Sequence, residues 1–199
     1  MLSQPRPTRG PQPTLTDGVV LLTAWRADDD VARGDFELDP DIARWIDSPS
    51  ADPDPARRRA QGADVIARWW REWADGTSLT FALRLAEHGD AIGEADLEPR
   101  SPITATVGYA VVPAFRGNGY APRAVRLLAE AGLTRFGFRR IELTCDTENP
   151  ASKRVAEKAG FASEGVRRGS GWYRHVPAFA GRPRDDAVYG LTELDLRPT

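Results

Sequence analysis

The sequence of 199 residues contains a single cysteine and has no long uninterrupted hydrophobic run. With only Cys145 available, no disulfide can form within the chain, and a reducing compartment is the simplest location. No segment approaches the length of about 20 apolar residues that a membrane-spanning helix needs. Residues 1–13 carry four prolines and two arginines but no apolar signal core, so we expect them to form a disordered tail. These absences predict a cytoplasmic protein without a membrane partner.

Lysine and histidine are also scarce. The formal net charge is −2, and Lys153 and Lys158 are the only lysines, so a broad basic surface for nucleic acid is not indicated. Of the two histidines, His88 lies in a predicted hairpin turn and His175 in a loop-rich segment. We therefore expect no nucleic-acid partner, and we expect both histidines at the surface.

Hydrophobic periodicity and capping residues indicate one domain over residues 14–199. Apolar and β-branched runs predict strands at residues 19–25, 79–85, 91–97, 104–112 and 140–145, with two more inside residues 162–174 and 187–193. Start and stop residues predict helices at residues 28–36, 40–46, 55–76, 121–136 and 150–160. This order predicts an α/β fold with a mixed sheet.

The segment 111–123 contains Gly117 and Gly119 between an apolar strand and a helix that has Pro122 in its first turn. The first N–H groups of a helix lack internal partners and lie at the positive end of its dipole, which suits a phosphate or pyrophosphate. The dinucleotide fingerprint G-x-G-x-x-G fails at Pro122, and no G-x-x-x-x-G-K-[ST] loop follows. Taken alone, the segment is also compatible with an ordinary strand-to-helix turn.

A second motif begins about thirty residues later, after the β-rich run 141–145. Asn149 is suited to cap a short helix, with Pro150 at its first position and Gly160 at its end. The two motifs read R-x-x-G-x-A, from Arg116 to Ala121, and N-x-x-S followed by a G-F pair. Their order and separation limit the families that the chain can resemble.

Together the two motifs resemble the GNAT superfamily of acetyltransferases. Residues 15–21 and 41–45 look like its RimJ/RimL-type branch, and the resemblance extends over almost all residues from Leu15 onward. It implies a mixed, mostly antiparallel sheet flanked by helices in an α/β/α sandwich. It also implies acetyl-CoA as co-substrate, no metal, and transfer of the acetyl group to a primary amine on a protein N-terminus or a small cationic molecule.

The same resemblance assigns residues to the donor. In this fold the strand before the glycine turn diverges from its neighbour and pairs with the pantetheine arm, and Asn149 and Ser152 lie near that arm. The strand positions are Tyr109, Ala110 and Val111. The pyrophosphate would be held by the turn and its nearby charge, at Arg116, Gly117, Asn118, Gly119, Tyr120, Ala121 and Pro122.

The catalytic groups are less clearly indicated. Many members of the superfamily protonate the departing CoA thiolate with a tyrosine four residues before the G-F pair, where this chain has Ala156. Ser152 is the substitute candidate, with a local hydrogen bond in the first helical turn as the alternative. For the general base, Glu94 and Asp96 are two apart on one strand and face the same side, either into a cleft or into solvent. Glu142 and Asp146 carry the same ambiguity.

The acceptor is indicated only by charge. Residues 28–54 contain ten acidic residues against Arg33 and Arg44, which would attract a cationic amine unless they serve only as helix caps and solvated faces. Trp69, Trp70 and Trp73 cannot all face the core, so one of them is expected at a cleft or an interface, and a homodimer remains among the candidate assemblies. Because the usual tyrosine is missing, a catalytically weak acyl-CoA-binding or sensing protein is the second functional hypothesis.

Overall fold

The computed structural model describes residues 10–46, 51–172 and 181–196. Residues 1–9 of the predicted tail and His175 lie outside these ranges. Residues 10–13 are described and contact the domain. The indole Nε1 of Trp73 donates to the carbonyl of Gly10 at 3.1 Å, and the Gln12 amide donates to the carbonyl of Thr80 at 2.8 Å.

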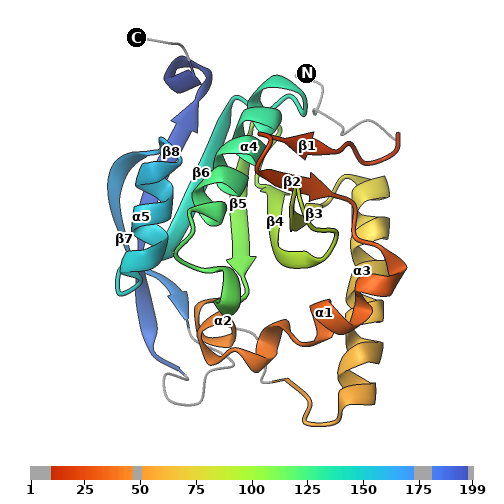
Figure 1. Ribbon diagram of the computed structural model, residues 1–199. Coiled ribbons are helices and arrows are strands. Elements are labelled where there is room, and N and C mark those ends of the chain that lie inside the picture. The colour runs from red at the N-terminus through yellow and green to blue at the C-terminus, as the bar shows by residue number, and fades with distance from the viewer. Residues whose placement is uncertain (1–9, 47–50, 173–180, 197–199) are drawn as a thin grey trace.

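Eight strands form one sheet in the order β1-β2-β3-β4-β5-β6-β8-β7 (Figure 1). Their bounds are β1 Leu15–Thr16, β2 Val20–Thr23, β3 Leu79–Leu85, β4 Ala91–Pro99, β5 Thr104–Val111, β6 Arg140–Asp146, β7 Ala162–Trp172 and β8 Pro183–Thr192. Every neighbouring pair is antiparallel except β5 and β6, which are parallel. The predicted hairpin of β3 and β4 is confirmed, whereas β8 begins earlier than the sequence indicated.

Five α-helices are described: α1 Asp30–Gly34, α2 Pro40–Trp45, α3 Pro55–Asp75, α4 Tyr120–Thr134 and α5 Pro150–Lys158. The predicted caps are confirmed, because Asp39, Asp54 and Asn149 accept backbone N–H groups at the starts of α2, α3 and α5. The single helix expected over residues 28–36 is wrong. A short 3₁₀ turn, Ala27–Asp29, leads into α1, and a second one, Phe36–Leu38, follows it.

Two apolar clusters pack on the sheet, as alternation along a strand requires. On β3, Phe81 and Leu83 belong to the larger cluster with α4, whereas Ala82 belongs to a smaller one with Ile66 and Trp69 of α3. Helices thus cover both faces, which confirms the predicted α/β/α sandwich (Figure 1). Trp69 and Trp73 are buried while Trp70 is 45% exposed, so the three tryptophans of α3 do not all face the core, as expected. That Trp70 lies at a cleft or an interface stays a prediction.

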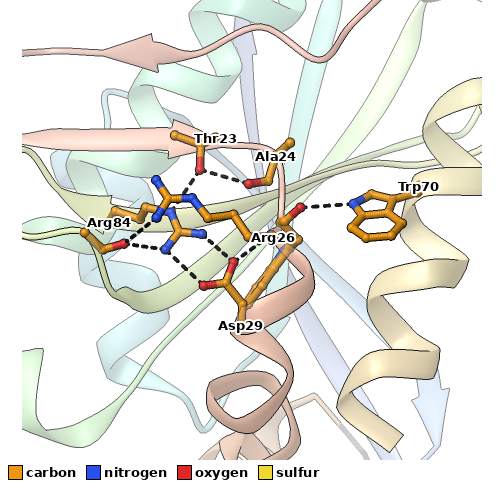
Figure 2. Close-up of polar contacts among 8 residues, drawn as sticks. Thr23, Ala24, Arg26, Asp29, Trp70 and Arg84 are labelled. Atoms are coloured by element: carbon orange, nitrogen blue, oxygen red, sulfur yellow. Dashed lines mark hydrogen bonds and ion pairs between the residues drawn. The ribbon is translucent and has the colours of Figure 1, made fainter. Parts of the chain in front are cut away.

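A buried ion pair fastens the turn before α1 to the sheet, as Figure 2 shows. Arg84 on β3 is 1% exposed, and both terminal guanidinium nitrogens contact the carboxylate of Asp29. Its remaining donors reach the Thr23 hydroxyl at 3.0 Å and the carbonyl of Gly89 at 2.5 Å. The sequence had placed Asp29 in an acidic wall; in the structure this carboxylate serves the fold.

Candidate active site

The central feature of the site is the separation of the two parallel strands. Their register runs only from Thr104 opposite Arg140 to Thr106 opposite Glu142. Beyond this point, a pocket of about 560 Å³ lies between residues 107–111 of β5 and residues 143–146 of β6. A strand that loses its neighbour in this way leaves a row of backbone N–H and C=O groups that an extended ligand can pair with. Tyr109, Ala110 and Val111 all line this pocket, as predicted.

The glycine turn closes one end of the same pocket. Gly117 and Gly119 have φ of 80° and 77°, a left-handed conformation that other residues rarely adopt, and a Cβ at either position would meet nothing within 4 Å. Gly119 caps α4 without a side-chain hydrogen bond, so no capping side chain occupies the first N–H groups of the helix. Tyr120, Ala121 and Pro122 also line the pocket. This arrangement suits an anion.

Asn118 has a supporting place in the turn. It is absent from the pocket lining, and its amide donates to the carbonyls of Phe115 at 3.3 Å and Arg116 at 3.1 Å. These two hydrogen bonds stabilise the backbone of the turn. Asn118 therefore holds the shape of the turn by its side chain and leaves the glycines exposed to a ligand.

Arg116 lines the pocket, but its guanidinium is directed toward α2. Its Nε donates to the carbonyl of Val111 at 2.9 Å, and its terminal nitrogens contact Asp39 and, at 3.5 Å, Asp41. The charge expected near a pyrophosphate is thus shared with two carboxylates. That Arg116 binds the donor stays a prediction.

The start of α5 contributes a further part of the pocket lining. Asn149 and Ser152 are both buried and line the pocket, and the Asn149 amide oxygen accepts the backbone N–H of Ser152 at 3.0 Å. The Tyr109 hydroxyl donates to Ser152 Oγ at 3.0 Å, a contact that joins β5 to α5. Burial raises the pKa of Tyr109 to about 12, although the hydrogen bond to Ser152 opposes this effect. Burial likewise raises the pKa of the nearby Cys145 thiol.

Several pocket residues were missed by the sequence reasoning. Arg154 and Lys158 of α5, Ile42 and Trp45 of α2, and Cys145 of β6 all line the pocket. The four-residue spacing of Arg154 and Lys158 on a capped helix places them on one face, so this pair was detectable. Within residues 10–46, 51–172 and 181–196 neither of the two forms an ion pair, which leaves their charge for a ligand.

The two candidate bases lie outside the pocket lining. Glu94 faces Arg33 of α1, with 3.4 Å between a carboxylate oxygen and the guanidinium Nε. Asp96 lies opposite the pocket residue Gly108, and a Cβ at Gly108 would be 2.5 Å from a carboxylate oxygen of Asp96. Burial, together with repulsion from Glu94 and Glu98, raises the pKa of Asp96 to about 7. Asp96 is thus the cross-strand neighbour of a pocket residue and does not itself line the pocket.

Several carboxylates of the acidic segment 28–54 form ion pairs with arginines of the same chain. Asp30 pairs with Arg59 at 2.7 Å, Asp35 pairs with Arg58 at 2.8 Å, and Asp29 and Asp39 pair with Arg84 and Arg116. Among the described acidic residues of this segment, only Asp41 lines the pocket. The acidic wall expected from composition is mostly a set of internal ion pairs.

Across residues 10–46, 51–172 and 181–196, helices with the length and apolar character to cross a membrane are lacking. The same ranges hold no cluster of at least three His, Cys, Asp or Glu side chains suited to a metal ion.

Comparison with known proteins agrees with this geometry. Residues 20–162 match the family described as acetyltransferase (GNAT) domain. A curated relative, the uncharacterized N-acetyltransferase YoaA of Bacillus subtilis, is 33% identical over 89 residues, which cover 45% of this chain and 47% of YoaA. The matched part of this chain spans less than half the length of the first three curated relatives.

Solved structures share the fold over nearly the whole chain. RimJ of Mycobacterium smegmatis, in complex with CoA-disulfide, has a TM-score of 0.75 and 23% identity, covering 94% of this chain and 91% of RimJ. The ribosomal-protein-S5-alanine acetyltransferase of Vibrio fischeri has a TM-score of 0.72 and 17% identity, covering 94% and 100%. At these identities the structures bear on the fold alone. Because the family match extends over residues 20–162, most of the domain that holds the pocket, the chain belongs to the GNAT acetyltransferase family.

Proposed function

We propose that this protein is an acetyl-CoA-dependent N-acetyltransferase that transfers the acetyl group to a primary amine. The observation that carries the proposal is one continuous pocket that joins an unpaired strand edge to the N-terminus of α4. Acetyl-CoA has the matching parts in the same order, because its amide-containing arm leads to a pyrophosphate. Neighbours of this fold were solved with CoA compounds, which supports the same ligand class here.

The donor would lie along β5. Tyr109, Ala110 and Val111 would pair with the arm through their backbones, with Asn149 on the opposite side. The turn from Gly117 to Tyr120 would receive the pyrophosphate at the α4 N-terminus. Arg154 and Lys158 would neutralise the remaining phosphate charge at the nucleotide end.

The residues around the reacting carbon have complementary tasks. A backbone N–H near Val111 would stabilise the oxyanion that forms when the amine attacks the thioester carbonyl. As the carbon–sulfur bond breaks, Ser152 would give its hydroxyl proton to the sulfur and regain one from solvent. Asp96 would take the proton of the attacking amine through water, because its raised pKa of about 7 suits a base at neutral pH.

The acceptor proposed is a protein N-terminus or a small cationic amine. Support comes from the structural neighbours named as ribosomal-protein acetyltransferases and from Asp41 at the pocket wall. A catalytically weak acyl-CoA-binding protein is the second candidate. It is favoured by the fully buried Ala156 at the position where many family members have a tyrosine.

Turnover distinguishes the two candidates. The protein is incubated with acetyl-CoA and a panel of amines, including peptides with free N-termini and polyamines, while thiol release is followed. Release that depends on the amine would exclude the binding-only protein. Tight CoA binding without amine-dependent release from any member of the panel would favour it.

The location of the pyrophosphate is tested by Gly119→Glu, which puts an anion at the cap of α4. We expect the Kd for CoA to rise about 100-fold, because like charges would then meet at a desolvated contact. Gly165→Glu is the matched control, since Gly165 on β7 also has a positive φ and open space around it. Calorimetric CoA titration that gives equal Kd values for the two variants would exclude this phosphate site.

A further inference from the structure

We propose that Tyr109 is a positioning residue for proton delivery, because its hydroxyl orients the Ser152 hydroxyl toward the departing sulfur. The inference rests on the proposed function and goes beyond it. Tyr109 was expected to contribute only its backbone to the donor, whereas the structure gives its side chain a defined partner 43 residues away.

The position of Ser152 is held at two points. Its backbone N–H is bound by the Asn149 amide oxygen at 3.0 Å, and its Oγ accepts the Tyr109 hydroxyl, also at 3.0 Å. Tyr109 and Ser152 both line the donor pocket, and Ser152 is only 8% exposed. A hydroxyl held in this way has few orientations left for its own proton.

The direction of that proton follows from counting donors and acceptors. A serine hydroxyl has one proton and two lone pairs, and Tyr109 occupies one lone pair. With its pKa raised to about 12, Tyr109 stays protonated at any physiological pH and acts as the donor. The proton of Ser152 must therefore point to another atom.

A sulfur atom already lies beside Ser152 in this structure. The Ser152 hydroxyl lowers the pKa of the Cys145 thiol on β6, against the larger effect of burial, and both residues line the pocket. Such a lowering means that the serine hydroxyl stabilises the thiolate form of a sulfur at the pocket wall. A thiolate released between β5 and β6 would meet the same donor.

This arrangement explains how the site can work with alanine at position 156. Ala156, one turn after Ser152 on α5, is fully buried and brings no hydroxyl. A phenol instead enters from β5 and acts through Ser152. In the step itself the carbon–sulfur bond breaks and the sulfur takes the Ser152 proton as solvent returns one to Oγ, so that no alkoxide forms and Tyr109 remains a neutral phenol.

The first test needs no acceptor. The pKa of the CoA thiol is measured from its thiolate absorbance in the binary complexes of wild type, Tyr109→Phe, Ser152→Ala and Tyr189→Phe, with CoA-free protein subtracted for Cys145. In the wild type we expect a value about 1 below that of free CoA, because a charge-assisted hydrogen bond favours the thiolate. Tyr109→Phe and Ser152→Ala should lose this lowering, whereas Tyr189→Phe, which removes a phenol buried in the core, should keep it. If the pKa of the CoA thiol bound to Tyr109→Phe equals that of the CoA thiol bound to wild type, the inference is overturned.

The second test uses turnover. We expect Tyr109→Phe to lower kcat about 10- to 100-fold with the KM for acetyl-CoA within about twofold, as for loss of an interaction specific to the transition state. In the Ser152→Ala background the same change should have no further effect. The inference is overturned if Tyr109→Phe lowers kcat by the same factor in the Ser152→Ala background as in the wild type. It is also overturned if Tyr109→Phe leaves kcat unchanged. Both outcomes leave the proposed function standing. A lowered CoA thiol pKa in a wild type without amine-dependent turnover would instead overturn the proposed function.

Discussion

At the scale of single residues, Asp96 shows how position decides the properties of a carboxyl group. It lies on β4 between Glu94 and Glu98, and burial together with these like charges raises its pKa to about 7. The pKa in the unfolded chain is about 3.9, so the folded state binds more protons between about pH 4 and pH 7. Through this group, the stability of the fold decreases as the pH rises across that window.

Asp96→Asn should therefore raise the free energy of unfolding by about 2 kcal/mol at pH 8, and by less at pH 5. If Asp96 is the general base, the same variant should lose about 100-fold in kcat/KM at neutral pH. Urea unfolding at both pH values and steady-state kinetics measure the two effects. Asp90→Asn, in the exposed turn after β3, is the control expected to change neither. Full activity in a stabilised Asp96→Asn protein would exclude the base assignment.

At the scale of elements, the short helix α2 depends on a contact outside itself. A helix of residues 40–45 is too short to be stable alone. One oxygen of Asp39 caps it, by accepting the Asp41 N–H at 2.9 Å, and the other contacts Arg116, whose Nε also bonds the carbonyl at the end of β5. Since Ile42 and Trp45 line the pocket, Arg116 connects the donor turn to this wall.

We expect Arg116→Gln and Asp39→Asn to raise the KM of the acceptor about tenfold, because each loosens α2, while the KM of acetyl-CoA changes less than about threefold. The control is Arg123→Gln, which removes an ion pair between α4 and Asp17. If Arg116 instead binds the pyrophosphate, Arg116→Gln alone will raise the KM of acetyl-CoA. Kinetics with both substrates varied separate these outcomes.

At the scale of the whole molecule, the Arg84–Asp29 pair joins segments that neither helix nor sheet bonds connect (Figure 2). Both side chains are buried, and Arg84 also holds the Thr23 hydroxyl and the turn carbonyl of Gly89. A buried pair is costly to break because the remaining charge loses both water and partner. The fold is therefore sensitive to loss of either member.

Asp29→Ala should lower the free energy of unfolding by about 3 kcal/mol, as observed when a buried ion pair loses one partner. The exposed pair of Arg100 and Glu98, 2.8 Å apart, is the matched control, and Arg100→Ala should cost less than about 1 kcal/mol. The double variant Asp29→Leu/Arg84→Met should recover much of the stability. Urea unfolding gives all of these values, and similar losses for Asp29→Ala and Arg100→Ala would contradict the role of the buried pair.

The features that could be predicted from sequence are those in which neighbouring residues decide the conformation. Asp39, Asp54 and Asn149 cap helices because each side chain reaches N–H groups two or three residues ahead. The glycine turn was equally readable, since positive φ at Gly117 and Gly119 selects glycine locally. With the spacing of the two motifs, these signals were sufficient for the fold, and the residues predicted for the donor line the pocket with the exception of Asn118.

The sequence by itself thus determined the helix caps, the glycine turn and the family. Tertiary structure alone decided which partners the charged and hydroxyl groups have. Alternation placed Glu94 and Asp96 on one face of β4, but only packing set Glu94 against Arg33 and Asp96 behind Gly108. The Arg116–Asp39 and Tyr109–Ser152 contacts join residues 77 and 43 positions apart. The physical reason is that such contacts depend on how the sheet brings distant elements together, and no spacing along the chain encodes that geometry.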